Sequence, residues 1–175
     1  FGSSFYETPA IDQMAAEGML FDNAYAACHV CSPSRAAILT GKSPARTNQT
    51  DWGGGRPERD YEKLHSGERV SRLPSDEQTL ADTLKKHGYA TANYGKTHVG
   101  RDPKTFGFDE AIAGWVTSYY YPFGKAYDKT LPAKEGDYFT DKLTDAVLDF
   151  IERKKDQPFF VHLEHFAVHD PIQGR

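Results

Sequence analysis

The sequence is short of cysteine, of long apolar runs and of charge blocks of one sign, and each shortage excludes a class of protein. Its 175 residues include two cysteines, too few for a fold held together by several disulfides. No run approaches the roughly 20 apolar residues that a membrane-spanning helix requires. Its 21 basic and 25 acidic residues are mixed along the chain, which argues against nucleic acid as a partner. We therefore expect a globular protein with neither a membrane span nor a nucleic-acid ligand.

The chain is long enough to bury one full hydrophobic core, and its apolar pattern alternates between helix and strand. Strands are expected over 19–25, 89–94 and 159–166, and each follows a helical pattern. Three successive helix–strand units predict a parallel sheet joined by crossover helices. The segments 42–75 and 101–137 show no periodicity, and long irregular segments inside a domain are usually functional or disordered. The helices are expected from Thr8 to Gly18 and over 31–40, 77–87 and 138–155.

Residues 31–41 read Cys-Ser-Pro-Ser-Arg-Ala-Ala-Ile-Leu-Thr-Gly, which predicts a helix with a thiol at its N-terminus. Ser32 is the expected N-cap, Pro33 fits the first helical position, and Gly41 is a suitable residue for the C-terminal end. The free N–H groups and the dipole of a helix N-terminus favour an anionic nucleophile or a bound oxyanion. Arg35 adds a fixed positive charge to the first turn.

Three chemically interesting segments each follow an expected strand. Cys31 follows the first strand, Lys96 and His98 follow the second, and His169 follows the third. Lys96 and His98 are two residues apart, so in an extended segment their side chains can face the same side. Because ligands bind outside the carboxyl ends of parallel strands, we expect all four side chains to share one pocket.

Other readings of the cysteines remain open. Cys28 and Cys31 have the Cys-x-x-Cys spacing of a redox pair, and with His29 they could supply metal ligands. A structural zinc site needs about four ligands, and no second Cys/His pair at a suitable spacing is present. Redox and zinc functions are therefore the weaker alternatives.

Several aromatic and histidine residues have both a structural and a functional interpretation. Trp52 lies in a glycine-rich run and could line a carbohydrate site, although packing of its own loop is the better expectation. The aromatic residues of 101–137, including Trp115, could stack on sugars or build a loop core. His165 is expected to support the site from behind. The histidines expected to be purely structural are His65, His87 and His162.

Three strings resemble the signature motifs of type I sulfatases, within the alkaline-phosphatase-like superfamily. Residues 31–41 resemble Cys-x-Pro-Ser-Arg followed by an apolar helix and Thr-Gly. Residues 95–100 resemble Gly-Lys-x-His-x-Gly, with Thr97 where the family often has tryptophan, and 165–171 resemble His-x-x-x-His-x-Pro. The resemblance implies an α/β fold with a mostly parallel sheet and helices on both faces. It also implies that residues 1–175 are part of a single catalytic domain.

The resemblance implies hydrolysis of a sulfate ester and a role for five residues. Cys31 would be oxidised by a separate sulfatase-maturing enzyme to formylglycine, whose hydrate supplies a hydroxyl nucleophile toward sulfur. Arg35 would hold the hydrate and balance charge, and Lys96 would bind the hydrate and a sulfate oxygen. His98 would deprotonate the second hydroxyl of the sulfated intermediate. His169 would bind sulfate and protonate the leaving oxygen.

The family also binds Ca²⁺ through carboxylate oxygens, and here Cys31 is the only metal ligand that can be carried over. The Asp-Asp pair that the family places on its first strand, and a second ligand set, have no counterparts in the sequence. The resemblance therefore implies an N-terminal portion that lacks its first strand and its C-terminal half and is inactive alone. A periplasmic or secreted location is expected, although no signal peptide is present and the chain begins with Phe.

The runs 41–52 and 138–145 resemble bacterial polysaccharide-directed sulfatases, including those acting on sulfates of galactose or N-acetylgalactosamine. A sulfated saccharide is therefore the expected substrate. Two alternatives stay open: a phosphoester or phosphonate ester hydrolase of the same superfamily, and a sulfated-glycan-binding protein that keeps the pocket without turnover. Conversion of Cys31 to formylglycine would favour an enzyme.

Overall fold

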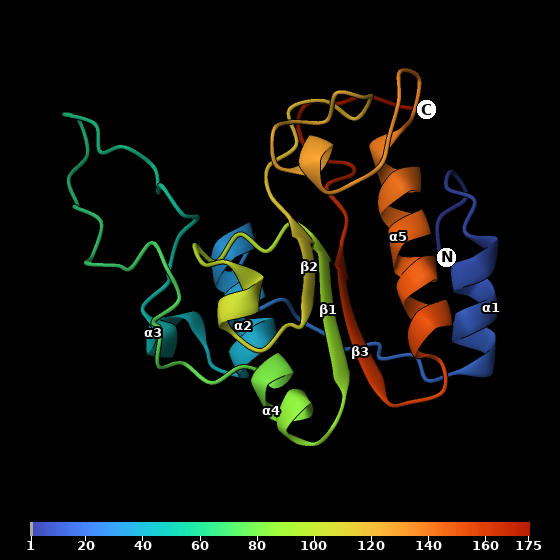
Figure 1. The fold of residues 1–175 in the computed structure, drawn as a ribbon. Coiled ribbons are helices and arrows are strands. Elements are labelled where there is room, and N and C mark those ends of the chain that lie inside the picture. Colours follow the sequence, from blue (N-terminus) through green and yellow to red (C-terminus); the bar gives the residue numbers. More distant parts are fainter. Residues whose placement is uncertain (1) are drawn as a thin grey trace.

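A computed structural model describes residues 2–175, and three parallel strands form its central sheet (Figure 1). The strands are β1 (Ala90–Gly95), β2 (Glu110–Ala113) and β3 (Phe159–Glu164), in the spatial order β2-β1-β3. Both β2 and β3 pair with β1 in parallel. The expected parallel sheet is confirmed, and β1 is its central strand.

Helices cover both faces of this sheet, as expected. In Figure 1, α2 and α4 lie on one side of the strands and α5 lies on the other. No helix in the described residues is long and apolar enough to cross a membrane. The helices are α1 (Pro9–Glu17), α2 (Cys31–Thr40), α3 (Pro44–Thr47), α4 (Leu80–Lys86) and α5 (Phe139–Lys154), with short 3₁₀ helices at Pro103–Thr105 and Tyr127–Lys129.

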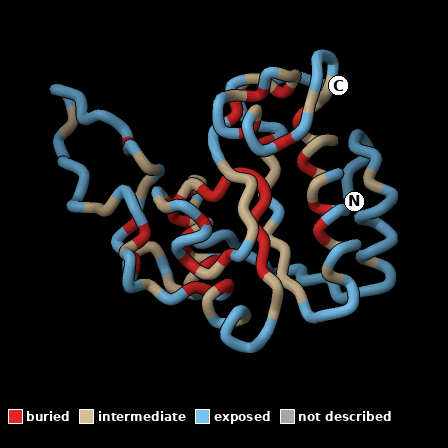
Figure 2. The backbone as a smooth tube through the Cα atoms, in the orientation of Figure 1, coloured by how far each residue is buried: buried red, intermediate tan, exposed pale blue. Residues whose placement is uncertain are grey.

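Helix α5 is the clearest element because its apolar side chains recur at helical spacing. Phe139, Leu143, Val147 and Phe150 are buried against the sheet. Burial of a large apolar side chain is worth about 1.5–3 kcal/mol, so this stripe fixes which face of α5 meets the strands. A second apolar cluster fills the opposite side of the sheet, around α2 and α4. Figure 2 shows that the central strand is buried, whereas its two neighbours are mostly of intermediate burial.

The expected strand over 19–25 is wrong, because these residues form no strand in the structure. Leu20 and Phe21 are 54% and 71% exposed. A β-strand is stabilised by cross-strand pairs and by burial of one face, and this segment has neither. Helix α1 forms where expected, but its apolar side chains Ile11 and Met14 are also exposed.

The sequence pattern missed β2, which falls in a segment expected to be irregular. Its four residues are Glu-Ala-Ile-Ala, a composition with little intrinsic strand preference. Its stability comes from pairing with β1, where Ala92 lies opposite Glu110 and Gly95 opposite Ala113. A pairing partner 18 residues away cannot be inferred from the local pattern of apolar residues.

The N-cap expected at Ser32 is also wrong. Helix α2 begins at Cys31, with Val30 as its extended N-cap residue. The Ser32 side chain is buried inside the first turn, where its hydroxyl accepts a hydrogen bond from the Gly53 amide at 3.2 Å. The predicted C-terminal end is confirmed, because Gly41 has a left-handed φ of 68° and its N–H donates to the Ala37 carbonyl.

Candidate active site

Cys31 and His98 meet at the carboxyl end of β1. Cys31 is the first residue of α2, and its Sγ lies 3.1 Å from Nδ1 of His98. His98 has a φ of 47°, in the left-handed region that non-glycine residues seldom adopt. Gly95 also has a positive φ, and a Cβ there would lie 2.0 Å from the Glu164 carbonyl oxygen. The turn that presents His98 therefore depends on a glycine at the end of β1.

Arg35 is fixed by contacts to two strand ends. Its Nη1 donates to the Lys96 carbonyl at 2.6 Å and lies 2.6 Å from Oε2 of Glu164. The other Glu164 carboxylate oxygen lies 3.2 Å from Nε2 of His162, whose Nδ1 lies 3.0 Å from Oδ1 of Asn93. Since the Glu164 side chain is only 8% exposed, this chain of contacts holds the guanidinium in one place.

Glu164 is a site residue that the sequence analysis missed. No motif singled it out, and a glutamate at the end of an apolar strand usually points to solvent. The available signal was its position inside an expected strand, two residues after His162, so that both side chains lie on the same face of the strand. His162 itself makes the hydrogen-bonded contacts expected of a structural histidine.

Lys96 is buried under aromatic side chains. It is 2% exposed, and its Nζ lies 4.9 Å from the ring centre of Trp115 and 5.5 Å from that of Phe166. Within residues 2–175, the ammonium group has no hydrogen-bond acceptor and no ion-pair partner at contact distance. Burial lowers the pKa of Lys96, and the Cys31 thiolate opposes that shift. The N–H groups of a buried cation are thus free to bind an anion.

The environment of His98 favours its neutral form. Burial lowers the pKa of this imidazole to about 4, and the positive charges of Lys96, Arg35 and His169 act in the same direction. At neutral pH the ring therefore carries one proton and can accept another. Gly53 lies beside the ring, since a Cβ there would be 3.6 Å from Nε2.

His169 lies on the other side of the Trp115 ring from His98. Trp115 lies between the two histidines, with its ring centre 5.5 Å from that of His98 and 6.0 Å from that of His169. The His169 amide donates to the Phe166 carbonyl at 2.7 Å, and the Tyr119 hydroxyl donates to the His169 carbonyl at 3.1 Å. The structure thus brings Lys96 and both histidines to one edge of the sheet, together with the Trp115 ring.

Cys31 opens onto a hollow of about 430 Å³ between α2 and the end of β3. The cysteine is partly exposed there. The hollow is lined by the start of α2, its preceding loop and β3, with these residues: Cys28, His29, Val30, Cys31, Ser34, Arg35, Ile38, Leu163 and Glu164. A substituent on the Cys31 β-carbon is therefore accessible from solvent.

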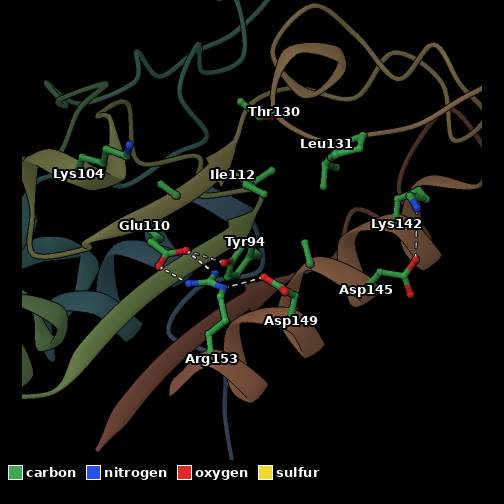
Figure 3. A pocket seen from close by; sticks show the side chains of 13 residues that line it. Tyr94, Lys104, Glu110, Ile112, Thr130, Leu131, Lys142, Asp145, Asp149 and Arg153 are labelled. Carbon is green, nitrogen blue, oxygen red and sulfur yellow. Dashed lines mark hydrogen bonds and ion pairs between the residues drawn. The ribbon is translucent and has the colours of Figure 1, made fainter. Parts of the chain in front are cut away.

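A separate cavity of about 560 Å³ lies between β2 and α5. Figure 3 shows Arg153 of α5 paired with Glu110 of β2 and with Asp149 of its own helix, while Lys142 pairs with Asp145. None of the five candidate site residues lines this cavity. Most of its charged side chains are paired with one another.

The described residues do not fit a calcium ion by themselves. They contain no group of three or more histidine, cysteine or carboxylate side chains that could hold a metal. The side chain in contact with Cys31 is the His98 imidazole, and the Lys96 ammonium interacts with Cys31 electrostatically, whereas Ca²⁺ requires about six to eight oxygen ligands. The one nearby carboxylate, Glu164, is already paired with Arg35. The same finding gives the Cys28–Cys31 pair no partners for a zinc site within residues 2–175.

The parallel sheet with helices on both faces belongs to the alkaline-phosphatase-like fold, which the structural neighbours of this chain share. A family model described as Sulfatase matches residues 1–174, so the chain belongs to the sulfatase family.

Curated relatives agree with this assignment. The N-acetylgalactosamine-6-sulfatase of Homo sapiens is 34% identical over 201 residues, which cover 98% of this chain and 37% of that protein. The N-acetylglucosamine-6-O-sulfatase of Bacteroides thetaiotaomicron is 31% identical over 170 residues, covering 97% and 27%. The chain thus spans about a third of the length of these relatives.

Solved structures give the same family. A crystal structure of Ps i-CgsB in complex with k-i-k-neocarrahexaose matches with a TM-score of 0.76 and 29% identity, covering 99% of this chain and 42% of that one. A structure in complex with D-glucosamine-2-N,6-O-disulfate matches with a TM-score of 0.68 and 30% identity, covering 97% and 31%.

Proposed function

We propose that the protein hydrolyses sulfate esters of carbohydrates, with residues 1–175 forming part of a single catalytic domain. The observation that carries the proposal is the position of Cys31 at the first residue of α2, against a neutral His98 and near Arg35 and Lys96. Membership of the sulfatase family supports the same reaction class.

Cys31 is the proposed precursor of the catalytic residue. A separate maturing enzyme would oxidise its side chain to the aldehyde of formylglycine, whose hydrate supplies a hydroxyl nucleophile toward sulfur. The fit of this group is supported by the accessible hollow beside Cys31 and by the free helix N-terminus behind it. Cys31 is the only residue of this chain that we propose as a calcium ligand. The roles proposed for the other residues do not involve calcium.

Lys96 and Arg35 are proposed to stabilise the charge of the sulfate group. The ammonium of Lys96 has its N–H groups free, and Glu164 prevents Arg35 from turning away. Donors that are already in place stabilise developing negative charge without a cost of reorganisation. These two side chains would therefore bind the sulfate oxygens as charge builds up on them.

The two histidines are proposed to move protons. His98 is neutral at physiological pH and lies in contact with the side chain of residue 31, so it can accept a proton there. His169 donates its Nδ1–H to the Asp170 carbonyl, so Nε2 is the ring nitrogen left to exchange a proton. In the doubly protonated ring, Nε2–H would donate its proton to the leaving oxygen and leave the neutral ring with its proton on Nδ1. A sugar alkoxide is a poor leaving group unless it is protonated.

A sulfated galactose or N-acetylgalactosamine residue is the proposed substrate, and a periplasmic or secreted location is proposed with it. The curated N-acetylgalactosamine-6-sulfatase and the structures solved with saccharides support this substrate class. Sulfated polysaccharides are met outside the cytoplasm, which supports the location.

The proposal is tested by producing the protein in a host that has a sulfatase-maturing enzyme. Peptide mass mapping should show the Cys31 side chain converted to an aldehyde. Because the chain spans about a third of the length of its curated relatives, turnover is assayed on a full-length version of the protein, which should hydrolyse an aryl sulfate and galactose 6-sulfate in preference to an aryl phosphate. The Cys31→Ala variant should lose turnover, while Cys28→Ala, three residues away, should retain it.

Three results would contradict the proposal in different ways. Preference for the aryl phosphate would indicate a phosphoester hydrolase. Binding of the sulfated sugar without turnover by the converted protein would indicate a glycan-binding protein. Turnover that survives Cys31→Ala would remove residue 31 from the reaction.

A further inference from the structure

Trp115 is held rigidly beside the candidate active site. The next residue, Val116, is 2% exposed in the main core, so the backbone at this point is anchored by burial. The Thr117 amide donates to the Phe123 carbonyl at 2.8 Å, which closes the loop behind it. A Cβ at Gly114 would lie 2.6 Å from the Cβ of Ala126, so the backbone before Trp115 packs closely on its neighbour.

The Trp115 side chain has both a fixed part and an open part. Its ring lies within 6.0 Å of the ring centres of His98, His169 and Phe166 and covers the Lys96 ammonium. The residue nevertheless remains 50% exposed. Half of a large aromatic surface is thus open to solvent directly beside the groups proposed to bind sulfate.

An aromatic surface in this position suits one part of the substrate. A sugar sulfate combines an anionic group with a pyranose ring whose axial C–H groups form an apolar face. Ligand sites typically join apolar walls to a few placed polar groups, and tryptophan offers a large, stiff apolar surface. With the sulfate at Lys96, the sugar that carries it must lie within a few ångströms of Trp115.

We propose that Trp115 is a specificity-determining residue that stacks on the sugar ring carrying the sulfate. This inference rests on the proposed function, because it needs the sulfate to be bound at Lys96. Trp115 has a second effect through its contact with Lys96, since a cation over an aromatic face is stabilised there. The test must therefore separate sugar stacking from support of the ammonium.

Trp52 provides a matched control within the same chain. It is the other of the two tryptophans and is 42% exposed, close to the exposure of Trp115. It packs over its own loop, since a Cβ at Gly54 would lie 2.8 Å from its ring. Substitution of Trp52 should therefore leave the recognition of the sugar unchanged.

The experiment compares the binding of galactose 6-sulfate and of inorganic sulfate to the full chain by calorimetry. Trp115→Ala should lower the ratio of the two affinities by about tenfold or more, as expected when a central tryptophan is truncated. Trp115→Phe, which keeps a ring, should recover most of that ratio, and Trp52→Ala should not change it. In the Trp52→Phe protein, galactose 6-sulfate should shift the fluorescence of Trp115.

The possible failures are distinguishable. Equal loss of affinity for both ligands in Trp115→Ala would mean that the residue acts only through Lys96, which overturns sugar stacking but leaves the proposed function standing. Unchanged affinity for both ligands in Trp115→Ala would also overturn sugar stacking and leave the proposed function standing. Absence of binding of both ligands to the unsubstituted chain would contradict the proposed sulfate site, and the inference would fall with it.

Discussion

Lys96 joins three parts of the site through three different groups. Its amide donates to the Glu164 carbonyl at 3.0 Å, and its carbonyl accepts from Arg35 at 2.6 Å. Its ammonium lies under Trp115 and Phe166. Because two of these contacts belong to the backbone, the side chain of residue 96 can be changed while both hydrogen bonds are kept.

Glu164→Gln should destabilise the protein. The substitution keeps the shape of the side chain but removes the charge that balances Arg35, and breaking a buried ion pair costs 3–5 kcal/mol. Because Arg35 is partly exposed, we expect a loss of about 2–3 kcal/mol in the free energy of unfolding. Urea denaturation at pH 7 measures the difference.

The control for this change is Glu152→Gln on the exposed surface of α5. Glu152 pairs with Lys155, and its side chain is 72% exposed. Exposed pairs contribute about 0–1 kcal/mol, so little change is expected. If the two variants lost equal stability, the Glu164–Arg35 pair would have no special role.

Protonation of His98 should weaken the fold at acid pH. Its pKa is about 4 in the folded protein, against about 6.5 in an unfolded chain, so the unfolded state binds more protons between these values. The free energy of unfolding therefore falls as the pH is lowered from about 6.5 through about 4. NMR titration should place the His98 midpoint near pH 4, and melting temperatures should fall across the same window.

The variant His98→Gln should reduce that dependence without abolishing it. Burial also lowers the pKa of His165, so this second histidine contributes in the same direction. A His98 midpoint at or above 6.5 would show that the ring is more exposed to solvent than the structure places it.

At the scale of elements, helix α4 depends on its first turn. Thr79 accepts from the Asp82 amide at 3.1 Å, and the Asp82 carboxylate accepts from the Thr79 amide at 3.0 Å, forming a capping box. The Thr79 hydroxyl also donates to the Phe106 carbonyl at 2.9 Å. One buried hydroxyl thus ties α4 to the loop before β2.

Thr79→Ala should cost about 1–2 kcal/mol of stability, the usual range for loss of an N-cap. Thr79→Ser keeps the hydroxyl and should retain most of that stability. Both are measured by chemical denaturation. If alanine and serine behaved alike, the methyl group and not the hydroxyl would be responsible.

Elements could be predicted where the signal was local. Helix α5 and strand β3 have strong apolar patterns. Both lie within a few residues of their expected bounds, as does the less apolar β1. The segment 19–25 has the composition of a strand but finds no pairing partner in the described residues. Strand β2 is the reverse case: its composition does not favour a strand, but pairing with β1 stabilises it as one.

The same distinction applies to the site. The proximity of Cys31 and His98 could be predicted from the sequence, because Cys31 opens a helix and His98 follows a strand, each within a recognisable motif. The structure places the two side chains in contact. The role of Glu164 could not, because it arises from the parallel pairing of β1 with β3. For Trp115, the sequence leaves sugar stacking open, but its contact with Lys96 arises from the packing of a long loop. Neither relation has a fixed spacing along the chain.

At the scale of the whole molecule, the positive site groups lie on a chain with a net charge of −4. Sulfate binding should therefore stabilise the folded state specifically at this site. A ligand at about 100 times its Kd adds about 2.7 kcal/mol to the free energy of unfolding. For a chain of this size, that corresponds to a rise in Tm of about 5–10 °C.

Thermal melts in sodium sulfate, against sodium chloride at equal ionic strength, test this expectation. Lys96→Ala should remove the difference between the two salts while keeping both backbone hydrogen bonds of residue 96. An equal response of the variant and the unsubstituted chain to sulfate would place the anion elsewhere on the molecule.

The hydrogen bond from the Lys96 amide to the Glu164 carbonyl has an evolutionary consequence. This bond extends the hydrogen-bond ladder that aligns β1 and β3 to the residue that carries the Lys96 ammonium. An insertion or deletion within either strand would therefore shift the register and displace Lys96. The loop that carries Trp115 lies outside this ladder and can change length or composition without moving Lys96. The sugar preference proposed for Trp115 can therefore diverge while the sulfate site proposed at Lys96 is kept.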